Sequence, residues 1–281
     1  LSKETSIIIN NWFMMYFLSV VLIGTIYPIF LEVLSSQKIS VGPPFYHKLI
    51  IPFLIPFLMA MAIGPKLKWI KSNIVDKFYL VLFFAISIVL SFLIVKKFST
   101  NLLINTILVS SALYLFFITL RDFFIRKYSN ISQNIAHFGF SLLILSILLN
   151  NLFSSEIITN LKVGETFTSS KTKIVFKNIN QKQEKNYKSI IANFSIENIN
   201  ETIEDLSPEL RIYNQPNIVT SEADIKTTLL SDKFIVINIV QNQDYFNVRY
   251  QVKPFMLWIW ISVILISFGG LLSFFKREHE K

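Results

Sequence analysis

The sequence contains no cysteine, and only 16% of its 281 residues are charged. The first absence excludes a disulfide, a thiolate metal site and a cysteine nucleophile within this chain. The scarcity of charge accompanies 52% hydrophobic residues and 27 phenylalanines, a composition too apolar for an ordinary soluble domain. The formal net charge is +9, but no soluble segment shows a basic face, so we expect no nucleic-acid partner.

Six long apolar segments predict membrane-spanning helices, because about 20 apolar residues of helix cross the hydrocarbon core of a bilayer. The second segment is the shortest and contains Pro52 and Pro56. Proline removes a backbone donor, which a membrane helix tolerates where neighbouring protein satisfies the freed carbonyl groups. We therefore expect the second helix to be packed inside a bundle. The predicted spans are residues 12–34, 48–63, 78–95, 102–120, 135–153 and 255–275.

The lysines and arginines of the short loops predict how these spans are oriented. If residues 1–6 lie in the cytoplasm and the spans alternate, the inside segments carry eleven Lys and Arg and the outside loops carry four. This distribution follows the positive-inside rule, so the net charge is mainly a signal of topology. The chain begins with Leu and shows no cleavable signal peptide, and we expect it to be the C-terminal part of something longer.

The segment between the fifth and sixth spans is polar, and it alternates apolar with polar residues in a way that is typical of half-buried strands. The clearest runs are "KIVFKNI" (173–179), "SIIANFSIEN" (189–198), "KFIVINIV" (233–240) and "YFNVRYQV" (245–252). The sequence thus predicts a mainly α-helical polytopic membrane protein with an external all-β domain inserted before the last span. Its expected parts are a five-span bundle at 1–153, the β domain at 154–253, and the last span with a cytoplasmic tail at 254–281.

An ionisable side chain inside a membrane span is costly, which makes His137 a functional hypothesis. Gln133, Asn134 and Ser141 share its face of the fifth predicted helix. Gly139 would let a flat cofactor or a neighbouring helix approach the backbone closely. Three roles fit His137 on these grounds: hydrogen-bonded packing, a step on a proton path, or axial ligation of haem iron with a polar neighbour orienting the imidazole.

The connection at residues 36–48 lies outside in this topology and combines a glycine and two prolines with two aromatic residues. We interpret it either as a stiff turn with aromatic side chains at headgroup depth, or as part of a surface over which an amphipathic ligand or a partner lies. His47, in the same connection, is expected to be incidental. The residues of this candidate outer surface are Gly42, Pro43, Pro44, Phe45 and Tyr46.

Several of these segments together resemble one family. They are "LIGTIYPIFLEVLSSQKISVGPPFY" (22–46), "AIGPKLKW" (62–69), "IAHFG" (135–139), "PELRIYNQP" (208–216) and "VKPFMLWIWISVILISFGGLL" (252–272). In order and spacing they are similar to the C-terminal portion of CcmF, the membrane haem lyase subunit of cytochrome c maturation. The resemblance extends over nearly the entire chain.

The resemblance implies a function. Members of the family take haem from the haem chaperone CcmE and deliver it to apocytochrome c, whose cysteine thiols add to the haem vinyl groups outside the membrane. They also hold a b-type haem in the membrane between two histidines on different spans, the second in an "AHxG" sequence. Here that position is His137, which is therefore the expected axial ligand of haem b, with Asn134, Ser141 and Gly139 as neighbours that orient the imidazole or pack on the haem.

The same resemblance implies which parts of a haem lyase lie outside this chain. The tryptophan-rich haem-handling segment, its flanking histidines and the other membrane histidine precede the region that this chain covers in the family. Expected partners are therefore the remainder of its own chain or a split N-terminal half, CcmE, thiol-handling proteins of the CcmH type, apocytochrome c and membrane lipid. No catalytic residue can be named in this portion. The expected location is a bacterial inner membrane with a periplasmic β domain, or alternatively a mitochondrial inner membrane.

Two other functions remain open from the sequence. A transporter subunit would explain the proline-broken second span and the polar residues at membrane depth, but it predicts inverted repeats, and no convincing repeat is visible. A membrane scaffold carrying a β binding module is the second alternative. It predicts that function survives replacement of His137.

Overall fold

The computed structural model describes residues 2–35, 38–69, 77–98, 101–125, 130–169, 172–198, 203–240 and 244–279. The chain divides into two compact units. One unit is helical and comprises Leu1–Leu148 together with Ile259–Lys281, and the other comprises Leu149–Trp258 and is built mainly of strands.

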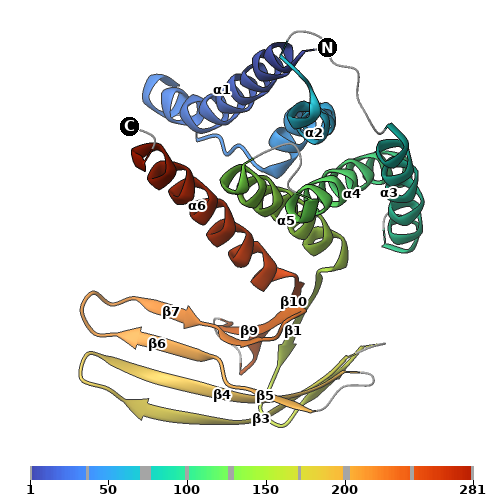
Figure 1. Ribbon diagram of the computed structural model, residues 1–281. Coiled ribbons are helices and arrows are strands. Elements are labelled where there is room, and N and C mark those ends of the chain that lie inside the picture. The colour runs from blue at the N-terminus through green and yellow to red at the C-terminus, as the bar shows by residue number, and fades with distance from the viewer. Residues whose placement is uncertain are drawn as a thin grey trace. The chain divides into compact units, whose positions relative to one another are not determined.

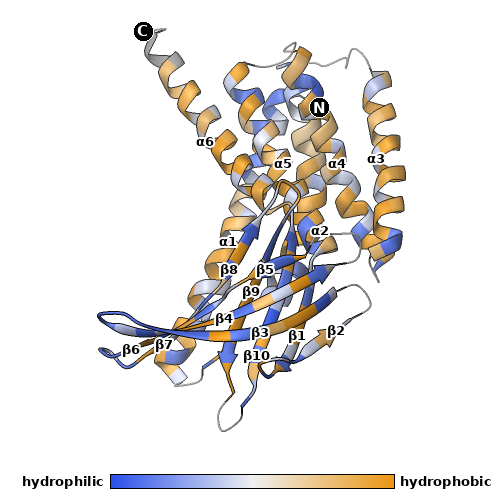
Figure 2. Ribbon diagram, turned by 90° about the horizontal axis from the view of Figure 1, so that it is seen from below, coloured by the Kyte–Doolittle hydropathy of each residue, from blue (hydrophilic) through white to orange (hydrophobic). Residues whose placement is uncertain are grey.

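Six helices among the described residues are long and apolar enough to cross a membrane, which confirms the predicted number of spans. Figure 2 shows apolar residues around most of the circumference of these helices, whereas apolar and polar residues alternate along the strands. A helix that is apolar on all sides suits a lipid environment. The helices are α1 (Lys3–Ser35), α2 (Pro43–Ile63) with a 3₁₀ turn η1 (Gly64–Lys66), α3 (Lys77–Phe98), α4 (Leu102–Ile125), α5 (Ile131–Phe153) and α6 (Met256–His279).

Two helix starts differ from the prediction. Helix α1 begins nine residues before the predicted span, and the Thr5 amide donates to the Ser2 hydroxyl (3.3 Å) at its start. Ser2 therefore caps the helix, and the polar residues after it are its first turn. Helix α2 begins at Pro43, because proline at the first helical positions loses no hydrogen bond. The sequence predicted a stiff connection over residues 36–48. From residue 43 onward this prediction is wrong, because the chain there is helical.

The helical unit is arranged around α4. Figure 1 shows α5 between α6 and α4, with α3 on the other side of α4. In the most apolar stretch of α4, 56% of the residues are buried. In the corresponding stretch of α2, only 17% are buried. The proline-containing second span was expected to be packed inside a bundle, but among the described helices α4 is the most buried. Pro52 and Pro56 remain within one continuous helix, which packs against α1 and α4.

The second unit contains two antiparallel sheets that enclose one apolar core, which confirms the expected all-β domain. One sheet has the strand order β1-β10-β9-β8, and the other has the order β2-β3-β4-β6-β7 with β5 paired to β4 (Figure 1). The strands are β1 (Ser155–Leu161), β2 (Thr166–Thr168), β3 (Thr172–Gln183), β4 (Tyr187–Asn198), β5 (Glu204–Leu206), β6 (Glu209–Tyr213), β7 (Val219–Glu222), β8 (Asp224–Thr227), β9 (Ser231–Ile239) and β10 (Phe246–Pro254).

The core of this sandwich comes from the alternating positions that the sequence indicates. Phe176 on β3 and Phe194 on β4 are fully buried and stack with their ring centroids 4.4 Å apart. Ile235 and Tyr250 are paired across β9 and β10 and are also buried. Since side chains on a strand alternate between faces, each long strand contributes one apolar row to the core.

The first and last strands of the sandwich lie side by side. Strand β1 follows directly after α5, strand β10 leads directly into α6, and the two pair from Ser155 opposite Val252 to Leu161 opposite Phe246. The chain turns from β10 into α6 at Phe255, whose φ of +62° is rare for a residue with a side chain.

Candidate functional site

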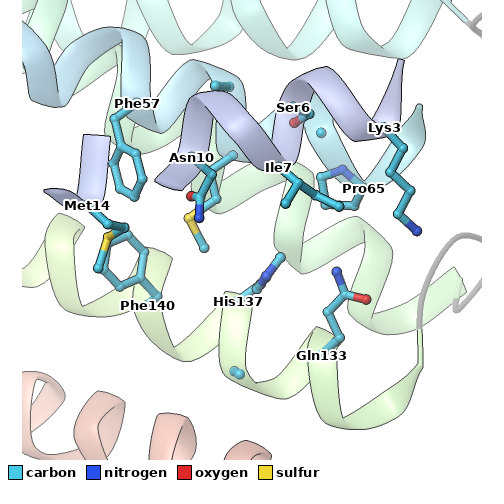
Figure 3. Close-up of a pocket in the computed structure, with 14 residues that line it drawn as sticks. Lys3, Ser6, Ile7, Asn10, Met14, Phe57, Pro65, Gln133, His137 and Phe140 are labelled. Carbon is cyan, nitrogen blue, oxygen red and sulfur yellow. The ribbon is translucent and has the colours of Figure 1, made fainter. Parts of the chain in front are cut away.

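His137 lies in the second turn of α5, and its imidazole points away from the helix toward Ile7 and Asn10 of α1 (Figure 3). The space that it faces is a cavity of about 420 Å³ within the helical unit. We call this cavity the His137 pocket. Its lining residues are Lys3, Ser6, Ile7, Asn10 and Met14 of α1, Phe57, Ala60 and Met61 of α2, Gly64 and Pro65 of η1, and Gln133, Ala136, His137 and Phe140 of α5.

The His137 pocket has a polar end and an apolar end. In Figure 3, Lys3 and Gln133 lie on one side of the imidazole, and Phe57, Phe140 and Met14 lie on the other. The rings of Phe57 and Phe140 meet edge to face at 6.1 Å between their centroids. An apolar cavity of a few hundred Å³ with a small number of polar groups is typical of a cofactor or ligand site.

Asn134 and Ser141 share the face of His137 as predicted, and their side chains join α5 to α4. Asn134 donates from Nδ2 to the backbone carbonyl of Asp122 (3.1 Å), and the Ser141 hydroxyl lies 2.7 Å from the Thr119 hydroxyl. Both residues are buried. Asn134 also lines, with His137, Thr119 and Asp122, a second cavity that is only about the size of one water molecule.

A buried ion pair borders this small cavity, and sequence reasoning missed it. Lys66 and Asp122 are hydrogen-bonded through Nζ and Oδ2, with side chains 1% and 11% exposed. Arg121 adds a second cation, with Nη1 3.9 Å from Asp122 Oδ1 and its guanidinium 3.6 Å from the centre of the Tyr79 ring. Lys66 and Arg121 are two of the eleven basic residues that the sequence places in the inside segments as signals of topology. The acidic residue in the apolar run "LRDFF" was the signal that could have located the pair.

Gly139 faces α6 instead of the His137 pocket. A Cβ atom at this position would lie 3.0 Å from the side chain and amide nitrogen of Ile266. Gly269 makes the reciprocal approach, because a Cβ there would lie 2.8 Å from the Ala136 amide nitrogen. Of the two uses expected for Gly139, close approach of a helix is therefore the one that the structure contains.

The candidate outer surface is partly covered by α1. Phe45 and Tyr46 are half-buried, and a Cβ atom at Gly24 of α1 would lie 2.7 Å from the Tyr46 hydroxyl. Gly42 precedes α2, and Pro43 and Pro44 are exposed in its first turn. Phe45 and Tyr46 thus contact α1, whereas Pro43 and Pro44 stay exposed.

His47 is exposed in the first turns of α2 and does not line the His137 pocket. It precedes Met61, which does line that pocket, by 14 residues, or roughly 21 Å along a helix. The two histidines therefore cannot bind one haem between them. Among the described residues, no group of three His, Asp or Glu side chains is placed to hold a metal ion.

A set of apolar helices, interrupted before its last member by a β-sandwich, defines a polytopic membrane protein with an inserted domain, and the pocket beside His137 is its candidate site. Sequence comparison then shows what the chain is similar to. The family model described as the CcmF C-terminal beta-sandwich matches residues 152–254.

Individual relatives extend the match to the helices. The cytochrome c-type biogenesis protein CcmF of Pseudomonas fluorescens is 27% identical over 293 residues, covering 99% of this chain and 44% of the relative. CcmF of Escherichia coli strain K12 is 24% identical over 289 residues, covering 100% of this chain and 45% of the relative. The solved structure of "Cytochrome c Heme Lyase CcmF" shares the fold with a TM-score of 0.73 at 19% identity, over 96% of this chain and 45% of that chain. The chain thus spans a little under half the length of these relatives.

Proposed function

We propose that this chain forms the C-terminal part of a cytochrome c haem lyase and that His137 is one axial ligand of a b-type haem in the membrane. The observation that carries the proposal is the imidazole of His137 facing an apolar pocket of about 420 Å³ inside the helical unit. The likeness to CcmF relatives over the whole chain supports it independently.

The residues present fit such a haem from one side. A neutral imidazole is a common ligand of haem iron, and Phe57 and Phe140 supply apolar surface for a macrocycle. Lys3 and Gln133 at the other end of the pocket offer a cation and an amide to carboxylate groups. The second axial ligand would come from outside the residues that line this pocket, because His137 is the only histidine among them.

The haem, when bound, supplies one-electron redox chemistry. The chain's own part is to position the imidazole and to keep water from it. Helix α5 holds His137 in place because the Thr119–Ser141 and Asn134–Asp122 hydrogen bonds fix it against α4, and the tight contact at Gly139 fixes it against α6. Contacts with α4 and α6 therefore fix the part of α5 that carries His137. This fixed geometry favours ligation with little reorganisation.

The proposed role includes partners. Haem would arrive from CcmE and would be joined to apocytochrome c with the help of CcmH-type thiol-handling proteins, outside the membrane. The rest of the same chain, or a separate N-terminal half, would supply the external haem-handling residues. The charge distribution favours a sandwich outside the cytoplasm. The bacterial relatives favour a bacterial inner membrane, with the sandwich then in the periplasm, and a mitochondrial inner membrane is the alternative.

The test is a reduced-minus-oxidised visible spectrum of the purified protein, with the rest of its complex present, for the parent and for His137→Ala. We expect a b-type spectrum in the parent that is lost or shifted in the variant. His47→Ala is the matched control, because it removes an exposed histidine by the same substitution and should leave the spectrum unchanged.

The same variants separate the proposal from its rivals. A scaffold or a transporter subunit predicts that His137→Ala supports normal cytochrome c maturation as long as the protein accumulates in the membrane. A folded His137→Ala protein with an unaltered haem spectrum would remove His137 from the ligand role.

A further inference from the structure

The turn between β8 and β9 exposes two leucines at its tip. Leu229 is 71% exposed and Leu230 is 69% exposed. No charged residue occurs between Lys226 and Asp232, so the tip is uncharged on both sides of the leucines. The turn itself is well defined, because Thr228 hydrogen-bonds with Ser231 through both its amide and its hydroxyl. The turn therefore presents two adjacent leucines that the sandwich does not bury.

Hydrogen bonds tie this turn to the first residues of α6. The indole Nε1–H of Trp258 donates to the Leu229 carbonyl (2.9 Å), and the Phe255 amide donates to the Leu230 carbonyl (2.8 Å). Ser231, the next residue, pairs with Pro254 across β9 and β10. The left-handed backbone of Phe255 is the bend that brings the start of α6 onto the turn. All of these residues belong to the same compact unit, so their arrangement is fixed within it.

The depth of the turn in the membrane follows from these bonds. Residues Met256–Phe275 of α6 form a candidate membrane span, so Phe255 and Trp258 lie where that span enters the bilayer. Tryptophan is enriched at this level, with its ring among the lipid headgroups. A turn bonded directly to the Trp258 indole must lie within a few ångströms of the same level.

We propose that the Leu229–Leu230 turn is a lipid anchor of the sandwich, inserted among the lipids of the leaflet that α6 enters. Its occupant is the headgroup–acyl boundary of the bilayer. Apolar side chains at this boundary gain the same burial that holds amphipathic helices on membranes. The inference is independent of haem and of the proposed lyase function, since it rests on the sandwich and α6 alone.

Val163 provides a matched control within the same domain. It is 50% exposed in the turn that follows β1. That turn lies at the opposite end of the sheet, because Leu161 pairs with Phe246 while Ser231 pairs with Pro254. The nine residues from 246 to 254 span roughly 26 Å of extended strand, because each of the eight steps between them adds about 3.3 Å. An exposed aliphatic residue at that end should therefore remain in water.

The absence of cysteine from the chain makes the test direct. Leu230→Cys and Val163→Cys would each carry one nitroxide spin label in this chain, attached before the chain is combined with the rest of its complex and reconstituted in phosphatidylcholine vesicles. Accessibility to oxygen, which concentrates in lipid, is compared with accessibility to a water-soluble nickel chelate. We expect the oxygen-to-nickel ratio at position 230 to be several-fold higher than at position 163.

Two results would overturn the proposal. Equal ratios at the two positions would place the turn in water. Exclusion of both reagents at position 230 would mean that a protein surface, not lipid, covers the turn. Leu229→Cys serves as an independent second probe and must show the same high ratio, so that a local defect of one variant does not decide the matter.

Discussion

Removing one partner of the Lys66–Asp122 pair should destabilise the helical unit strongly. With Asp122→Leu, the Lys66 ammonium, 1% exposed, loses the carboxylate to which it is hydrogen-bonded. Breaking a buried ion pair in this way costs about 3–5 kcal/mol. Lys66→Met should cost less, about 1–3 kcal/mol, because the remaining carboxylate still has Arg121 Nη1 at 3.9 Å.

The double variant Lys66→Met with Asp122→Leu distinguishes this reasoning from simple loss of packing. Replacing both charges of the hydrogen-bonded pair by apolar side chains removes the buried ammonium together with its carboxylate, and such replacements are often near neutral. Arg121 keeps its contact with the Tyr79 ring in this variant. The double variant should therefore be more stable than the Asp122→Leu single variant. The measurement is unfolding of the detergent-solubilised protein, followed by circular dichroism, for the four members of the cycle.

The control is Lys173→Met, which removes one partner of an exposed pair on the sandwich, where both side chains are about half exposed. It should leave the unfolding curve unchanged, because exposed pairs contribute little. The reasoning would be refuted if the double variant lost as much stability as the two single variants added together, or if Asp122→Leu behaved like the control.

Three further predictions concern packing and protonation. Gly269→Ala should cost about 1–3 kcal/mol, because its new Cβ meets the α5 backbone at 2.8 Å, whereas Gly270→Ala has open space and should be neutral or slightly stabilising in thermal unfolding. Phe194→Ala should cost about 3–5 kcal/mol by the same assay, since it removes a fully buried ring from the sandwich core. The Arg211 side chain, which donates a hydrogen bond to Glu209, lowers the pKa of Glu209 from its ordinary 4.5. The resulting stability is present above pH 4.5 and is lost as the pH falls through the lowered pKa, so Arg211→Met should flatten the acid side of a stability–pH curve.

Each of these has a clear contrary result. Equal melting temperatures for the two glycine variants would mean that α5 and α6 are not in close contact. A mild effect of Phe194→Ala would show that the sandwich core repacks around the missing ring. An acid limb unaffected by Arg211→Met would assign the pH dependence to other carboxyl groups.

The positions of the spans and of the long strands were predictable because both follow a single strong pattern. A run of about 20 apolar residues indicates a helix surrounded by lipid, and a two-residue alternation indicates a strand with one buried face. The four strand segments proposed from sequence all fall on β3, β4, β9 and β10. Short strands such as β2, β5 and β8 have too few residues to show alternation.

The candidate site was only partly predictable. The rarity of a histidine in a membrane span singled out His137, and helix periodicity placed Asn134 and Ser141 on its face. The first turns of α1 were missed, because Lys3 and Asn10 looked too polar for a span although they line the His137 pocket. The Lys66–Asp122 pair was also missed, because its two residues are 56 positions apart and only the packing of α2 and η1 on α4 brings them together.

Gly139 shows why a residue type alone does not specify a role. A glycine on a membrane helix permits close approach, but the sequence does not say of what. Its position two residues after His137 turns it about 200° around the helix, so the face that carries the imidazole and the face that meets Ile266 are different. One short segment thus serves both the pocket and the packing of α6.

The pairing of β1 with β10 has a consequence for how such a chain can vary. Ser155 and Val252 are neighbours across one strand spacing, about 5 Å, although nearly a hundred residues separate them in sequence. The sandwich therefore joins the end of α5 to the start of α6 over a distance as short as that bridged by a hairpin loop. Its sheets can be lengthened, trimmed or exchanged without altering the distance between the points where the chain leaves one helix and enters the next. The surface of the sandwich can thus diverge while the spacing between the end of α5 and the start of α6 stays the same.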